Sequence, residues 1–275
     1  MTLSERNTFF KIGIAFCAVC TLAVLGASFL TISIYPEMDK SIRRPAGFFH
    51  FITGFMDNNY LAVNVSLAAL VLFSLIGLIL IHFYFERTSA PEILYIAIFA
   101  VSFSFEAIRL ILPLQIIFNF SSFYVLIASR LLLFARFLSI FSLFAAGLCA
   151  AGMEIQKTRN VIFVMIIAAL IVVMGVPIDV LNWDSSFNMV NGYSSLFRVI
   201  ELIAFLTIMI SFVIAAKIRG TKEYHYAAIG ILLALAGRHV LLTADTWVGP
   251  VLGILLLSVG TGLLCSKLHK IHLWL

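Results

Sequence analysis

The sequence predicts an all-α polytopic integral membrane protein, a helix bundle of about eight transmembrane helices. Three observations support this prediction. Hydrophobic residues make up 63% of the 275-residue chain, charged residues only 11%, and the mean hydropathy is +1.12. A soluble domain carries about 25% charged residues, so a soluble core does not account for this much apolar surface. The apolar residues also form membrane-length segments, which short polar connections separate.

The expected elements follow in order along the chain. Each apolar segment approaches the roughly 20 residues that a helix needs to cross a bilayer. The expected spans are 11–34, 60–85, 92–117, 121–151, 160–178, 195–217, 224–243 and 247–266. The last span is the weakest because Gly249, Pro250 and Gly253 interrupt its start, so seven spans are the alternative. We expect a single transmembrane domain over 1–275, with an outer loop at 35–59 that holds an interfacial, Phe-rich segment.

Basic residues predict the orientation of the chain. Lys and Arg gather on the cytoplasmic flanks of membrane proteins. With the N-terminus inside, the inner flanks collect ten of them, and the outer flanks collect only Lys40, Arg43 and Arg44. The inner residues are Arg6, Lys11, Arg87, Lys157, Arg159, Lys217, Arg219, Lys222, Lys267 and Lys270. We therefore expect both termini inside, in a bacterial inner (cytoplasmic) membrane, and no nucleic-acid partner for the net charge of +5.

Ionisable residues inside the apolar segments need a separate explanation. A central Arg, Lys or Asp costs about 2.5–3.5 kcal/mol on insertion scales, so such residues should face the bundle interior. Glu106 and Arg109 lie three positions apart on the third span, and Arg198 and Glu201 repeat that spacing in reverse on the sixth. The helical rise places both pairs at a similar depth in the outer half of the membrane.

The sequence thus predicts one polar cluster that several spans share. Its predicted members are Glu106, Arg109, Arg130, Arg198, Glu201, Arg238 and His239. Arg136 is expected outside this cluster, in the inner half, where Glu86, Glu154 or lipid phosphates are its candidate partners.

The charge balance of the predicted cluster suggests a ligand. Four arginines face two glutamates, which leaves about two positive charges. The planar guanidinium fork matches phosphate and carboxylate groups. We therefore expect an anionic ligand, a lipid phosphate or a small organic acid, bound by a receptor-like or transporter-like protein. Membrane lipids are further expected partners, and no cofactor is expected.

Two alternatives stay open at this stage. In the first alternative, the charged residues form structural ion pairs and the protein is a subunit of a membrane complex, in which some of these charges pair with a partner membrane or cytoplasmic protein. Alternatively, the protein is an enzyme acting on a lipid headgroup, with Ser129 as the hydroxyl to test and His239 or a glutamate for acid–base chemistry. The sequence lacks G-x-S-x-G, H-E-x-x-H and P-loop motifs, so binding is favoured over catalysis.

Two stretches carry a resemblance to a known group of proteins. They are LIGLILIHFYFERTSAPEILYIAIFAVSFSFEAIRLILPL (75–114) and ASRLLLFARFLSIFSL (128–143). Both are similar to the seven-helix membrane regions of bacterial sensors with diverse intracellular and extracellular modules. The chain departs from that pattern because it has neither the extracellular nor the cytoplasmic output domain. The resemblance implies reception of a signal that is passed to a partner protein, and it assigns no functional residue.

Overall fold

The computed structural model describes residues 3–32, 59–86, 88, 90–152, 158–184, 186–192 and 194–273 of the 275-residue chain. In these ranges, eight helices are long and apolar enough to cross a membrane, which confirms the predicted all-α polytopic bundle. The interfacial segment predicted within 35–59 lies outside the described residues, apart from Asn59. The helices are α1 (Leu3–Ile32), α4 (Tyr60–Phe85), α5 (Pro91–Ser102), η1 (Phe103–Leu110), α6 (Ile111–Phe118), α7 (Ser122–Ala150), α8 (Thr158–Gly175), α9 (Ser194–Arg219), α10 (Glu223–Leu242) and α11 (Val248–Leu273).

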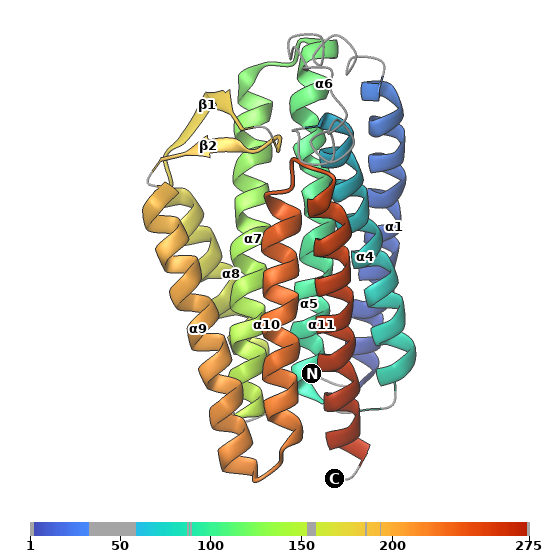
Figure 1. Ribbon diagram of the computed structural model, residues 1–275, viewed down its shortest axis with the longest axis vertical. Coiled ribbons are helices and arrows are strands. Elements are labelled where there is room, and N and C mark those ends of the chain that lie inside the picture. Colours follow the sequence, from blue (N-terminus) through green and yellow to red (C-terminus); the bar gives the residue numbers. More distant parts are fainter. Residues whose placement is uncertain are drawn as a thin grey trace, which may run out of the picture.

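The third span is the most buried of the eight and forms the centre of the bundle. Its first part, α5, packs against α4 and α7, and α10 packs against α11 in front of it (Figure 1). The two ends of the chain lie toward the same end of the bundle (Figure 1). We call this end the inner end, in keeping with the charge-based prediction, and the opposite end the outer end.

The last span is one continuous helix that is long and apolar enough to cross a membrane, which favours eight spans over seven. Gly249, Gly253 and Gly260 do not break this helix but pack closely against neighbouring residues. A Cβ atom built on Gly230 of α10 would lie 2.8 Å from the carbonyl oxygen of Gly260 and 2.9 Å from the amide nitrogen of Leu264, both on α11. Small residues allow such backbone contact between membrane helices. Gly237 and Gly253 repeat the contact one heptad away.

The third span changes its winding near its middle. Between α5 and α6 the chain forms the 3₁₀ helix η1, which contains Glu106 and Arg109. Pro113 follows one turn later, and because proline has no N–H group it removes a hydrogen bond from this part of the helix. The hydroxyl of Ser104 also donates to the carbonyl of Val101 at 2.7 Å. In a 3₁₀ helix, residues i and i+3 eclipse each other, so Glu106 stacks directly against Arg109.

A short β-hairpin that the sequence did not predict covers part of the outer end. Strand β1 (Ile178–Trp183) pairs antiparallel with β2 (Met189–Asn191), with Ile178 opposite Asn191. The strands lie beyond the outer ends of α8 and α9 (Figure 1). The hairpin loop, residues 184–188 between the strands, reaches back to the helices and contacts them.

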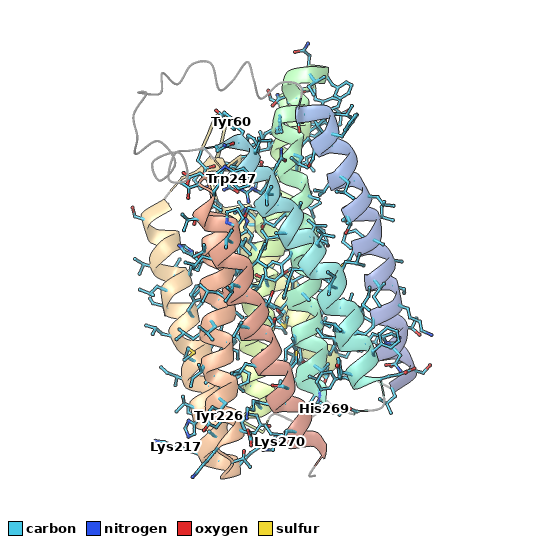
Figure 2. The ribbon with its side chains drawn as sticks, turned by 45° about the vertical axis from the view of Figure 1, so that its right-hand side comes forward. Tyr60, Lys217, Tyr226, Trp247, His269 and Lys270 are labelled. Atoms are coloured by element: carbon cyan, nitrogen blue, oxygen red, sulfur yellow. The ribbon has the colours of Figure 1, made fainter. Side chains whose placement is uncertain are left out.

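The inner end is held by charged groups near the helix termini. Arg6 of α1 donates to the carbonyls of Phe85 at 2.7 Å and Glu86 at 3.2 Å, where α4 ends. Glu223 of α10 accepts from Lys270 at 2.7 Å and lies 3.0 Å from Lys267, both on α11. Figure 2 shows the two ends: Lys217, Tyr226, His269 and Lys270 mark the inner end, and Tyr60 and Trp247 the outer end.

Candidate functional site

Glu106 is the centre of the polar cluster. Its side chain is 2% exposed. Arg136 of α7 binds it with two hydrogen bonds, from Nε to Oε1 and from Nη2 to Oε2, each 2.7 Å long. This two-fold geometry is the strongest form of arginine–carboxylate pairing. The prediction that Arg136 lies outside the cluster, paired with Glu86 or Glu154, is therefore wrong.

The depth of Arg136 explains the error. Arg136 lies 14 residues from the start of α7, or about 21 Å along an α-helix. Glu106 lies about 18 Å from the end of α6 at Phe118 at α-helical rise, and about 20 Å with the 3₁₀ rise of η1. With either winding the two residues are nearly level. Arg136 lies at the middle of α7 and not in its inner half, so the cluster reaches the middle of the bundle.

Arg109 is almost completely buried, although only part of its guanidinium is hydrogen-bonded. It is 1% exposed, and its Nη1 lies 3.6 Å from Oε2 of Glu106. Its Nη2 donates to the backbone carbonyl of Ser186 in the hairpin loop. The Nε and Nη1 groups have no hydrogen-bond partner among the described residues. A buried donor without a partner costs about 1–3 kcal/mol, and more when it is charged, so this arginine calls for an explanation.

Arg238 extends the cluster toward α9. It is 2% exposed and its Nη1 donates to Oε1 of Glu201 at 2.6 Å. Its Nη2 donates to the backbone carbonyl of Arg136 at 3.3 Å. Arg238 thereby connects α10 to both α7 and α9. The side chain of Glu201 is 25% exposed and that of Arg136 is 19% exposed, so each of the two pairs joins one buried and one partly exposed partner.

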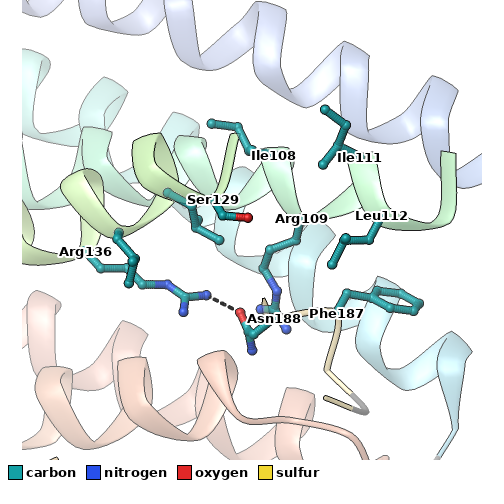
Figure 3. A pocket seen from close by; sticks show the side chains of 10 residues that line it. Ile108, Arg109, Ile111, Leu112, Ser129, Arg136, Phe187 and Asn188 are labelled. Carbon is teal, nitrogen blue, oxygen red and sulfur yellow. Dashed lines mark hydrogen bonds between the residues drawn. The ribbon is translucent and has the colours of Figure 1, made fainter. Parts of the chain in front are cut away.

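The hairpin loop closes the cluster from the outer side. The carboxylate of Asp184 accepts from the Ser186 amide at 3.1 Å and from the Asn188 amide at 2.8 Å, which fixes the turn. Asn188 in turn accepts from Nη2 of Arg136 at 2.6 Å (Figure 3). Phe187 is 4% exposed, adopts a left-handed backbone with φ 57° and stacks on Tyr60 with 5.8 Å between ring centres. In the sequence this segment falls between the expected spans 160–178 and 195–217, and the sequence predicts only a connection there.

Two of the seven predicted site residues, Arg130 and His239, lie outside the observed cluster, and a third, Arg198, is not tested. Arg130 donates to the carbonyl of Val173 at 3.0 Å and contacts the sulfur of Met174 at 3.9 Å, so it faces α8. His239 is exposed. The side chain of Arg198 is outside the described part of the structure. The structure brings together Glu106, Arg109, Glu201 and Arg238 from the prediction, and adds Arg136.

The charge balance is also closer than expected. Arg109, Arg136 and Arg238 face Glu106 and Glu201, which leaves one positive charge among the described helical side chains. Asp184 of the hairpin loop is near enough to interact electrostatically with both Arg109 and Arg136. With Asp184 included, the charges of the described side chains balance, and Arg198, which the expected surplus of two charges also counted, lies outside the described side chains. The neutralising charge sits on the loop and not on a helix.

A small cavity of about 20 Å³ lies between the two arginines and the loop. Arg109, Ser129, Arg136 and Asn188 supply its polar lining, and Leu112 and Phe187 contribute apolar walls (Figure 3). A cavity needs about 10–15 Å³ to hold one water molecule. The closed cluster therefore has room for a water beside the unpartnered groups of Arg109, but not for a phosphate.

Comparison with known proteins gives one distant relative. The chain is 21% identical to an uncharacterized protein of Treponema pallidum (strain Nichols), in an alignment of 349 residues that covers the whole of both chains. No protein-family model and no solved structure matches the chain. The eight apolar helices define a multi-pass integral membrane protein. The buried polar cluster is the feature of the described structure that bears on its function.

Proposed function

We propose that this protein binds an anionic ligand, carrying a phosphate or carboxylate group, between Arg109 and Arg136, and that it acts as a receptor or a transporter. One observation carries the proposal: Nε and Nη1 of the buried Arg109 guanidinium have no hydrogen-bond partner among the described residues, and Arg109 and Arg136 line the same cavity. An anion with two oxygens would satisfy these donors, because arginine recognises carboxylate and phosphate through paired hydrogen bonds.

The hairpin loop occupies the place that the ligand would take. Arg109 binds the Ser186 carbonyl and Arg136 binds the Asn188 side-chain oxygen, so the loop supplies oxygen acceptors where an anion would. Asp184 supplies the matching negative charge. Withdrawal of the loop removes that charge, restores one net positive charge to the cluster and enlarges the cavity. Ligand binding is thus an exchange of the loop for the anion.

The third span offers a place where such an exchange is coupled to the rest of the bundle. Stretches of 3₁₀ helix within a longer helix often mark hinges. Residues Glu106 and Arg109 lie on η1, directly between α5 and α6. In a receptor, loss of the loop contact would shift η1 and pass the signal to a partner protein, as the sensor resemblance implies. In a transporter, the same shift would open a path toward the inner end.

An enzyme acting on a lipid headgroup is a second candidate, supported by the presence of Ser129 in the lining of the same cavity. Its weakness is that no His, Asp or Glu is among the described residues that line this cavity. His239, the histidine predicted to assist, is exposed and lies outside the described cavity lining. Binding therefore accounts for more of the geometry than catalysis does.

Thermal unfolding of the purified protein tests the proposal. Titration with inorganic phosphate, succinate and phosphatidic acid in mixed micelles should raise the Tm of the wild type for at least one anion, since a ligand that binds the folded state stabilises it. Arg109→Gln should abolish that rise. Arg130→Gln is the matched control, because this arginine also lies in the membrane but faces α8, and it should keep the rise. An equal response of both variants, or no response of the wild type to any of the three, contradicts the proposal.

A further inference from the structure

A second and much larger pocket lies in the inner half of the bundle, away from the polar cluster. Its volume is about 490 Å³, within the usual range for sites that hold small molecules. The walls come from α4 and α11 and the floor from α5, where Ile96, Phe99 and Ala100 are buried. We call it the α4–α11 groove. Its α4 wall includes Ile76, Leu80 and Tyr84, which are 55%, 50% and 66% exposed, so the groove opens to the surroundings of the bundle.

The length of the groove matches one leaflet of a bilayer. Along α4 its lining runs from Phe73 to Phe85, and along α11 from Ser258 to His269. At 1.5 Å per residue these stretches measure about 18 Å and about 16 Å. Half of the hydrocarbon core of a typical bilayer is about 15 Å thick. An occupant that fills the groove thus has the length of a lipid chain in the inner leaflet, and is shorter than a membrane-spanning helix.

The inner end of the groove differs in chemistry from the rest. His269 lines it, and Nδ1 of that ring is buried without a hydrogen-bond partner among the described residues. The ring packs edge-on against Phe85, with 5.3 Å between ring centres. Lys267 and Lys270 of the same helix contact α10 and do not line the groove: both pair with the Glu223 carboxylate, and Lys267 lies 4.7 Å from the centre of the Tyr226 ring. Together they leave one positive charge at the inner end of α11, the end that His269 and Lys270 mark in Figure 2. Positive charge at the cytoplasmic side of membrane helices attracts anionic headgroups.

Two glycines keep the groove open. A Cβ atom on Gly262 of α11 would meet nothing within 4 Å, and one on Gly77 of α4 would meet only the ring of Phe73, at 3.9 Å. This differs from Gly230 and Gly260, where backbone atoms of the neighbouring helix fill the space. Close helix packing therefore does not explain Gly77 and Gly262, whereas an occupant of the groove does.

We propose that the α4–α11 groove binds one acyl chain of an anionic phospholipid from the inner leaflet, with the headgroup at His269. The apolar lining, the one-leaflet length, the unpartnered His269 nitrogen at the inner end and the two open glycines all match this ligand. The site is independent of the outer arginine cluster, so it stands whether or not that cluster binds an anion.

Photo-crosslinking tests the site directly. The full-length protein is placed in nanodiscs that contain phosphatidylglycerol with a photoreactive group on one acyl chain, and crosslinked peptides are identified by mass spectrometry. Wild type should crosslink at residues 73–85 and 258–269. Gly262→Leu and Gly77→Leu should lower this crosslinking at least fivefold, because a leucine fills the groove. Leucine is a better helix former than glycine, so the variants should fold.

The control variant is Gly26→Leu. Gly26 on α1 also has nothing within 4 Å of a built Cβ atom, but it does not line the groove, so crosslinking should be unchanged. Equal crosslinking in Gly262→Leu and wild type would overturn the proposal. So would a dimer in native mass spectrometry that Gly262→Leu disrupts, since a second copy of the chain would then be the occupant.

The headgroup assignment has its own readout. Unlabelled phosphatidylglycerol should compete with the probe at least threefold better than phosphatidylcholine of the same chain length. His269→Gln should reduce that preference while leaving the crosslinked positions unchanged. Equal competition by the two lipids in the wild-type protein would show that the site does not select an anionic headgroup and would refute that part of the proposal.

Discussion

The contact between η1 and α7 and the contact between α10 and α11 join neighbouring helices by opposite means. The first is built from charged side chains, with the Glu106 carboxylate held by two hydrogen bonds from Arg136. The second has almost no side chains at its closest points, because Gly230 and Gly260 bring the two backbones together. Backbone packing of this kind leaves no space and no unused donor. The charged contact leaves both, beside Arg109.

This difference indicates which part of the bundle can change its conformation. A glycine contact depends on the fit between two helix backbones, so the helices have one packing arrangement there. A charged contact can exchange one oxygen partner for another at little cost, provided that each charge stays paired. In the proposed function the hairpin loop is the partner that the anion replaces, and it binds Arg109 and Arg136 through a backbone carbonyl and an amide oxygen. We therefore expect α10–α11 to be the fixed part and η1 with the hairpin to be the variable part.

The largest effect is expected for Glu106→Gln, which breaks the charged contact. Removing one member of a buried ion pair leaves an uncompensated charge and costs about 3–5 kcal/mol. The Tm in detergent should fall accordingly. The double variant Glu106→Gln/Arg136→Gln should recover part of the loss, because the stranded charge is then removed as well. A double variant that is as unstable as the sum of the two single variants would show that the pair is not coupled.

A smaller but clear effect is expected for Gly230→Ala, which breaks the glycine contact. The new methyl group would lie 2.8 Å from the Gly260 carbonyl oxygen, so the helices must move apart. Overpacking of this kind costs about 1–3 kcal/mol. Gly262→Ala is the control, because its methyl group would meet nothing within 4 Å and should leave the Tm unchanged or slightly raised. Thermal unfolding of both variants gives the comparison, and equal Tm values would contradict the packing argument.

The smallest effect is expected at the inner end, for Glu223→Gln. Lys267 and Lys270 both contact this carboxylate, but the lysine side chains are 28% and 54% exposed. Exposed ion pairs add little to stability and are screened by salt. The Tm should change within experimental error. A drop comparable to that of Glu106→Gln would mean that the helix termini, and not the middle of the bundle, hold the structure together.

The sequence predicted the spans well because hydropathy and helix length together determine where a chain can cross a bilayer. It also singled out Glu106 and Arg109, since charged residues within an apolar segment are costly unless they are buried and paired. The last span was harder, because Gly253 has the same appearance in a sequence whether it breaks a helix or packs against a neighbour. Only the position of Gly237 across from it distinguishes the two cases.

Arg136 and the hairpin loop were missed for a different physical reason. Arg136 was expected in the inner half, whereas it lies at the middle of α7, nearly level with Glu106. The 3₁₀ winding of η1 shifts Glu106 by only about 2 Å, and Pro113, Ser102 and Ser104 were its available signals. The loop residues Asp184, Ser186 and Asn188 carried the signal of a tight turn only. A sequence does not show that such a turn folds back onto arginines from other helices.

The proposed exchange of the hairpin loop for an anion at Arg109 and Arg136 is tested most directly by cryo-electron microscopy of the protein in nanodiscs. Structures are determined without an anion and with whichever of phosphate, succinate and phosphatidic acid raises the Tm most. We predict density for the anion within hydrogen-bonding distance of Nε and Nη1 of Arg109, with the Ser186 carbonyl moved away from that arginine. An unchanged loop contact at saturating anion, with no added density beside Arg109, would contradict the account.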